Sequence, residues 1–404
     1  MQRLNFNIPL LIGGATTSKA HTAVKIEHNY SNDATVYVSD ASRSVNVVST
    51  LLNRDNKPAF TADLREEYAM IRERTANRKS KRELIDYQVA NTKPLQFDWA
   101  DYTPPVPSFT GTKVLSDYPL ERLVESIDWT PFFITWSLAG KYPAILSDDK
   151  VGAAARDLFS DAQAMLKEII DGKLLQANAV FGFWEAASIG NDVRLTASAK
   201  GLPDRIHFLR QQMPKPDSQE QLCLADFVAP VTSGKQDFIG GFAVTAGLGA
   251  EALAARYQAE NNDYASLMVK ALADRLAEAF AEHLHQRVRT EFWGYAGDES
   301  LSSEEIIAER YRGIRPAPGY PACPEHSEKE ALFALLEANA NAGMALTDSY
   351  AMTPAASVSG YYFSHPKSRY LSIGKISQEQ VDDLSLRSGK DNADLPRLLA
   401  PNLD

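Results

Sequence analysis

The residues best suited to hold a ligand lie in one proline-rich stretch, 313–326, which reads GIRPAPGYPACPEH. Its prolines fix φ and remove backbone donors, so the stretch predicts a stiff, irregular loop and neither a helix nor a central strand. Within it, Arg315 carries the planar fork that pairs with a carboxylate. Gly319 lets a ligand approach the backbone, and Tyr320 offers a flat face with a polar tip. A rigid corner that only packs is the alternative interpretation.

A second segment offers a carboxylate. Residues 127–133 read IDWTPFF, which places Asp128 between apolar residues and shortly before a proline. There it could cap the following helix or accept the ammonium or hydroxyl group of a ligand. Cys323 and His326 are only two metal ligands, which is too few for a site. The string TAGLGA at 245–250 invites a Rossmann-type methyltransferase interpretation, but it matches the glycine fingerprint of that fold poorly.

The net charge, the apolar runs and the cysteine count exclude several classes of protein. A formal net charge of −10 argues against a general nucleic-acid-binding protein, which needs a basic face. No apolar run reaches the length of a membrane span, and the N-terminus lacks the regions of a signal peptide. The two cysteines cannot form a disulfide framework, so we expect a reducing, cytoplasmic compartment.

The N-terminal residues alternate between strand and helix patterns. Apolar runs at 8–12 and 35–39 predict strands, and the stretches 19–30 and 41–52 predict helices. This order implies a parallel sheet of the doubly wound α/β class, in which ligands bind at the carboxyl ends of the strands. Two strands cannot bury both faces of such a sheet, so we expect these residues to be the end of a larger domain.

The rest of the chain divides into a linker and one mixed domain. An exposed helix is expected at 60–74, and the basic run 72–82 is either a solvated linker or a docking patch for an acidic partner. From residue 111 onward, helices and strands without strict alternation predict an α+β domain. Its expected strands are 177–184, 193–195, 224–228, 237–244, 355–363 and 370–376, and its longer helices are 151–170, 264–290 and 328–339.

Residues 264–290 form the clearest predicted helix. Apolar side chains recur every four residues from Met268 to Val288 and should face the core. Glu278 and Glu282 lie off this stripe, on a face that we expect to be mostly solvated.

Two strings in the chain match a known family. RPAPGYPACPEH resembles the S-adenosylmethionine motif in the activation domain of cobalamin-dependent methionine synthases, and IDWTPFF resembles a second segment of that domain. The resemblance covers nearly the whole chain. It implies the end of a Rossmann-like cobalamin-binding domain at 1–60, a helix and linker at 61–110, and an α+β activation domain with an antiparallel sheet at 111–404.

The resemblance also implies which residues bind S-adenosylmethionine. Arg315 would pair with its carboxylate and Asp128 with its ammonium group. Tyr370, which composition alone would assign to the core, would border the ligand together with Leu371. The remaining implied contacts are the backbone around Ala317 and Gly319 for the adenine or ribose, Glu309 as a lesser candidate, Glu278 facing the ligand cleft or the cobalamin domain, and Tyr320 approaching the corrin.

For cobalamin, the resemblance implies three small residues. Gly13, Gly14 and Ala41 would line the space for the nucleotide tail. The family motif Asp-x-His-x-x-Gly, whose His ligates cobalt from below, is absent, so we do not expect this chain alone to hold cobalamin tightly. Zinc is expected only in the homocysteine module, which this chain lacks along with the folate module.

The implied function is reactivation of methionine synthase, the methyltransferase that makes methionine from homocysteine and 5-methyltetrahydrofolate. The domain would bring S-adenosylmethionine to inactive cob(II)alamin, while flavodoxin or an equivalent reductase supplies one electron. The protein's task would be mainly positioning, because a sulfonium already makes the methyl group electrophilic. The alternatives are a docking module for flavodoxin and the cobalamin domain, and a self-contained small-molecule methyltransferase.

Overall fold

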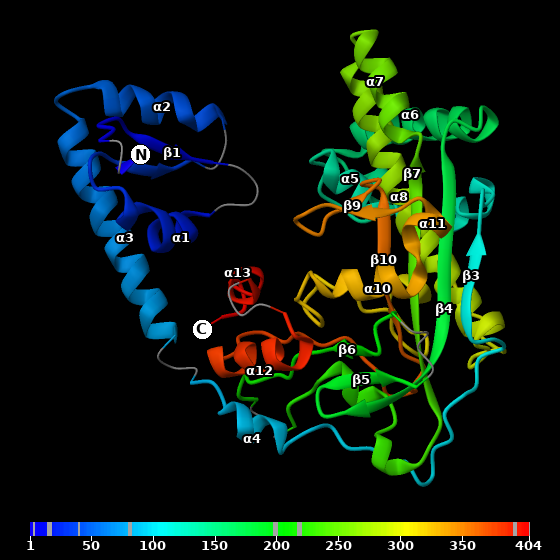
Figure 1. Cartoon of the computed structure of the whole chain (residues 1–404). Coiled ribbons are helices and arrows are strands. Elements are labelled where there is room, and N and C mark those ends of the chain that lie inside the picture. The colour runs from blue at the N-terminus through cyan, green and yellow to red at the C-terminus, as the bar shows by residue number, and fades with distance from the viewer. Residues whose placement is uncertain are drawn as a thin grey trace. The chain divides into compact units, whose positions relative to one another are not determined.

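A computed structural model describes residues 1–2, 5–13, 18–38, 41–79, 83–196, 201–215, 220–390 and 394–403 (Figure 1). Its contacts divide the chain into two compact units, Met1–Glu83 and Leu84–Asp404. The contacts therefore place 61–83 with the first unit and 84–110 with the second. The three-part division at 60 and 110 stays a prediction.

The first unit contains the expected parallel strand pair. Strands β1 (Leu10–Ile12) and β2 (Thr35–Tyr37) pair in parallel, with Leu11 opposite Val36. Helical turns from α1 (Lys19–His21) to Asn29 connect them, and α2 (Ala41–Leu52) and α3 (Lys57–Lys79) follow. Tyr68 of α3 is fully buried, and its hydroxyl accepts a hydrogen bond from the backbone N–H of Tyr37 at 2.9 Å. Helix α3 therefore packs against the rest of this unit through Tyr68 and through the partly buried Phe60 and Leu64.

The second unit is built on an antiparallel sheet, in agreement with the predicted α+β class. The strand order is β10-β7-β4-β5-β6, and β3 also pairs with β4. Figure 1 shows β4 and β7 as the long central strands. The strands are β3 (Gly111–Leu115), β4 (Gln176–Ile189), β5 (Asp192–Leu195), β6 (Arg205–His207), β7 (Asp237–Leu248) and β10 (Ser357–Tyr362), and a separate pair is β8 (Ala345–Leu346) with β9 (Met352–Thr353).

The two faces of this sheet bury separate cores. Alternation along β4 and β7 sends Phe181 and Phe242 into one core, and Val180 and Ala243 into the other. The first core is completed by α5 (Thr130–Thr135), α6 (Gly152–Asp171), α7 (Ala250–Ala259) and the apolar stripe of α8 (Asp263–Arg287). The second is completed by α10 (Glu328–Leu336) and α11 (Ala338–Ala342), and the remaining helices are α4 (Tyr87–Asn91), α9 (Ser303–Ile307), α12 (Gln378–Ser388) and α13 (Leu395–Leu398).

Several expected elements differ in the structure. The predicted strand 224–228 is a short 3₁₀ helix, because the Asp226 carboxylate accepts a hydrogen bond from the N–H of Cys223 and caps the turn. Residues 370–376, all described, form no strand and make only one bridge, from Ile376 to Leu403. The predicted helix 328–339 is divided at Glu337, whose φ is 47°.

The glycine-rich string at 245–250 is not a Rossmann loop. Strand β7 continues through Leu248, and only Gly249, at φ 93°, turns the chain into α7. The single feature that suggested a self-contained Rossmann-type methyltransferase is therefore part of the central antiparallel sheet.

Candidate ligand-binding site

The proline loop is fixed to the end of β10 by backbone hydrogen bonds. Ile314 and Phe363 exchange two such bonds, of 3.1 and 3.0 Å. The N–H of Tyr361 donates to the Pro316 carbonyl at 2.9 Å. Although its prolines cannot donate, the loop thus uses its carbonyl groups and its few N–H groups to extend the sheet edge.

A tight turn follows at Ala317–Cys323. The N–H of Tyr320 donates to the Ala317 carbonyl at 3.2 Å, and the N–H of Gly319 donates to the Cys323 carbonyl at 2.7 Å. Gly319 has a φ of 95°, a conformation that L side chains rarely adopt. Tyr320 is 62% exposed, so its ring is available to a partner outside the loop.

Arg315 lies at the centre of a cluster of polar side chains. Its Nη1 donates to Oε2 of Glu282 at 2.7 Å and to the hydroxyl of Tyr311 at 3.3 Å. Its backbone N–H donates to the hydroxyl of Tyr370 at 3.1 Å. Burial alone would lower the pKa of Arg315, but the Glu282 carboxylate beside it raises that pKa above its ordinary value, so the guanidinium stays charged.

One more predicted residue, Glu309, lies near Arg315, and Leu371 adjoins Tyr370. Glu309 follows α9 at a φ of 54°, after the helix has ended. Partial burial raises the pKa of Glu309, and the nearby Arg315 opposes that shift. Leu371 packs against two apolar clusters at once.

A cavity of about 290 Å³ opens beside the turn. Glu278, Ala317 and Tyr320 of the predicted set line it. Burial raises the pKa of Glu278, opposed by the charges of Arg275 and Arg315. The other lining residues come from the loop, α10, the β8–β9 turn, β9 and β10: Pro318, His326, Lys329, Ser349, Tyr350, Ala351, Met352, Ser357, Val358 and Ser359.

Asp128 is not among the residues that line this cavity. Its Oδ1 accepts a hydrogen bond from the N–H of Thr130 at 2.9 Å, at the start of α5. Trp129 is the N-cap residue of α5, so Asp128 stabilises the turn before the helix. Its half-buried side chain keeps a second carboxylate oxygen, and the predicted ammonium contact stays a prediction.

The residues predicted for cobalamin lie in the first unit. Gly13 is exposed and follows β1, and a β-carbon there would lie 3.1 Å from the Val38 carbonyl oxygen, which favours glycine. Ala41 is the first residue of α2. Gly14 lies outside the described residues.

Sequence reasoning missed several residues of the site, among them Glu282, His326 and Lys329. Glu282, expected on a solvated face, is the ionic partner of Arg315. His326 and Lys329 line the cavity, and Lys329 Nζ contacts His326 Nδ1 at 2.9 Å. The spacing of Glu278, Glu282 and Arg289 on one helical face was the available signal for Glu282.

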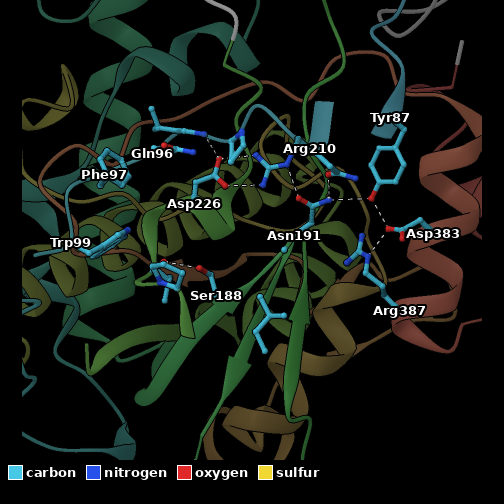
Figure 2. Close-up of a pocket in the computed structure, with 17 residues that line it drawn as sticks. Tyr87, Gln96, Phe97, Trp99, Ser188, Asn191, Arg210, Asp226, Asp383 and Arg387 are labelled. Atoms are coloured by element: carbon cyan, nitrogen blue, oxygen red, sulfur yellow. Dashed lines mark hydrogen bonds and ion pairs between the residues drawn. The ribbon is translucent and has the colours of Figure 1, made fainter. Parts of the chain in front are cut away.

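A larger cavity, of about 620 Å³, lies elsewhere in the second unit (Figure 2). Its polar wall is a chain of mutual contacts in which Asp226 pairs with Arg210, Arg210 donates to Asn191, and Asn191 donates to Tyr87. Tyr87 then donates to Asp383 at 2.6 Å. None of the predicted site residues that the structure describes lines this cavity.

Neither a group of metal ligands nor a membrane-spanning helix is found among the described residues. Within these residues, no three His, Cys, Asp or Glu side chains are grouped to hold a metal ion. No described helix combines the length and the apolar character needed to cross a membrane.

The comparisons with known proteins agree on one family. The model of the vitamin B12 dependent methionine synthase activation domain matches residues 119–389. The chain belongs to this family. A crystal structure of the MetH reactivation domain bound to AdoHcy is 50% identical to this activation domain, with a TM-score of 0.76, and the match covers 79% of this chain and 98% of that chain. The predicted family, fold class and enzyme class are thereby confirmed.

Proposed function

We propose that this activation domain binds S-adenosylmethionine in the 290 Å³ cavity beside the proline loop and presents its methyl group for reactivation of methionine synthase. The observation that carries the proposal is the AdoHcy bound to the related reactivation domain. AdoHcy is S-adenosylmethionine after loss of its methyl group. Arg315 does not itself line the cavity, but its charged guanidinium belongs to the loop whose residues Ala317, Pro318 and Tyr320 do, which supports the proposal.

The proposed contacts follow from the types of the residues. Arg315 pairs with the ligand carboxylate, because a guanidinium fork matches that geometry. Asp128 receives the ammonium group, and Tyr370 with Leu371 borders the ligand. Backbone groups at Ala317 and Gly319 bind the adenine or ribose. Glu278, which lines the cavity, and Glu309, beside Arg315, add negative charge near the sulfonium.

Cobalamin, when bound, supplies the cobalt that accepts the methyl group. In the described residues, the exposed backbone at Gly13 fits the approach of a large ligand. Tyr320 is exposed next to the cavity, where it can contact the corrin when the domains close. We assign electron supply to flavodoxin or an equivalent reductase. Both cysteines are free and buried, which supports a reducing cytoplasm as the compartment.

Calorimetric titration of S-adenosylmethionine into the purified chain tests this function. We expect saturable binding by the wild-type chain, and a loss of affinity of roughly 30-fold or more in Arg315→Ala, because a charge-assisted pair is removed. Arg315→Lys keeps the charge without the fork and should fall between the two. A folded wild-type chain that does not bind S-adenosylmethionine would overturn the proposal.

A further inference from the structure

Arg315 is held by a carboxylate from a distant part of the chain. Glu282 lies on α8, 33 residues before Arg315, and its Oε2 accepts the Nη1 hydrogen bond at 2.7 Å. The side chains are 17% and 19% exposed, so this ion pair is partly shielded from water. A shielded pair is worth more than one on the surface, because the effective dielectric constant is lower.

Glu282 also lies near a second, buried arginine, with no hydrogen bond between the two side chains. Nη1 of Arg289 lies 3.8 Å from Oε1 of Glu282, and Arg289 is fully buried. Two hydrogen bonds of 2.7 Å join Arg289 to Glu299, and the Arg289 guanidinium lies 4.1 Å from the centroid of the Tyr311 ring. The positive charge of Arg289 also offsets the negative charge of Glu282. Without it, the Glu282 carboxylate would repel an anionic ligand near Arg315.

The side-chain contacts of Arg315 all involve one nitrogen of its guanidinium group, Nη1. Nη1 meets Glu282, the Tyr311 hydroxyl and, at 3.5 Å, the His285 ring. Among the described residues, Nε and Nη2 of Arg315 have no hydrogen-bond partner. An arginine presents five donors in a rigid plane, so fixing Nη1 also fixes the direction of the Nε–Nη2 edge.

We propose that Glu282 is a positioning residue for ligand binding. By holding Nη1, it directs the Nε–Nη2 edge of Arg315 toward the ligand carboxylate. This inference rests on the proposed function and deepens it, because it assigns recognition of the amino-acid end of the ligand to an acid that does not touch the ligand.

Two ligands separate positioning from general support of the fold. S-adenosylhomocysteine carries the carboxylate, and 5′-methylthioadenosine lacks the whole amino-acid end. We expect Glu282→Ala to weaken S-adenosylhomocysteine binding about tenfold and 5′-methylthioadenosine binding less than about twofold, because only the first ligand uses the Arg315 fork. Glu282→Gln keeps an acceptor oxygen for Nη1 and should restore most of the loss. Glu291→Ala, which removes an exposed acid that pairs with Arg287, is the control.

The double variant Glu282→Ala/Arg315→Ala completes the test. Because Glu282 acts through Arg315, adding Glu282→Ala to Arg315→Ala should cause no further loss of S-adenosylhomocysteine affinity. If Glu282→Ala weakens the binding of both ligands equally, or if the double variant loses further S-adenosylhomocysteine affinity by the full amount, the inference is overturned. The proposed function would remain intact in either case. Absence of S-adenosylmethionine and S-adenosylhomocysteine binding by the wild-type chain would overturn both. If Glu282→Ala does not fold, Glu282→Met, which keeps much of the side-chain volume but has no acceptor oxygen, takes its place in the comparison of the two ligands.

Discussion

The imidazole ring of His326 occupies the space that a β-carbon on Gly319 would need. An ideal β-carbon at Gly319 would lie 2.7 Å from Nδ1 of that ring. A contact of 2.9 Å between its Nδ1 and Lys329 Nζ also holds the ring in this position. Gly319 is thus required for two reasons, its φ of 95° and the ring beside it.

Gly319→Ala should therefore damage both the fold and the site. We expect a loss of about 2–3 kcal/mol in the free energy of unfolding, from the left-handed backbone and the displaced ring, and weaker S-adenosylmethionine binding. Denaturant unfolding and calorimetry measure the two effects. Gly234→Ala is the matched control, since Gly234 has a φ of 66° and nothing within 4 Å of its added β-carbon. Equal losses of stability in the two variants would contradict the prediction.

The buried Arg289–Glu299 pair should be a major support of the second unit. Its side chains are 0% and 5% exposed, so Glu299→Ala leaves a buried guanidinium without its main partner. We expect a loss of about 3–5 kcal/mol of unfolding free energy. Glu291→Ala breaks an exposed arginine pair nearby, with side chains 26% and 55% exposed, and should cost less than about 1 kcal/mol. Chemical denaturation of the two variants checks the difference.

Substitutions of Asp128 can distinguish a turn-stabilising role from a ligand-binding one. Asp128→Asn keeps an oxygen for the Thr130 N–H but removes the charge, so stability should stay within about 0.5 kcal/mol of wild type. If the carboxylate receives the ligand ammonium, S-adenosylmethionine affinity should fall roughly tenfold in this variant. Unchanged affinity in Asp128→Asn, with destabilisation in Asp128→Ala, would leave Asp128 a purely structural residue.

His365 should make the stability of the second unit depend on pH. Its ring lies 4.1 Å from Phe97 and 4.7 Å from Tyr102, and burial, together with the charges of Arg312 and Lys367, lowers its pKa from 6.5 to about 4. Between these values the unfolded chain binds a proton that the folded chain does not, so stability is complete above about pH 6.5 and decreases toward pH 4.

The measurement is the unfolding free energy as a function of pH. We expect the His365 share to amount to about 2 kcal/mol between pH 7 and pH 4.5, with allowance for solvent screening. Fully buried His285 acts in the same direction, because burial lowers its pKa as well. His365→Phe should therefore flatten the wild-type profile only partly. A profile with the same slope as wild type would show that His365 does not contribute.

Local patterns in the sequence predicted much of the fold. The apolar side chains that recur every four residues predicted α8, because a long amphipathic helix depends mainly on its own periodicity. The strand expected at 224–228 failed for the opposite reason. There a buried carboxylate, Asp226, bonds to the N–H of Cys223 and to Arg210, and such a distant partner is invisible to local propensity.

The same contrast between local patterns and distant partners applies to the candidate site. The proline loop, Arg315 and Gly319 could be selected from residue type, since proline and glycine restrict the backbone wherever they occur. The pairing of Arg315 with Glu282 could not be predicted in this way, because it joins two segments 33 residues apart through the packing of the loop on α8. The cavity residues His326 and Lys329 were missed for a similar reason, since their direction depends on the turn at Gly319.

The hydrogen bonds between the proline loop and β10 have a consequence for amide hydrogen exchange. Because the N–H groups of Ile314, Tyr361 and Phe363 all close this junction, they can exchange with solvent only when the loop separates from the sheet. The loop and the end of β10 should therefore exchange together as one cooperative unit. A ligand then meets a surface whose conformational entropy was already lost in folding, and little further ordering accompanies its binding.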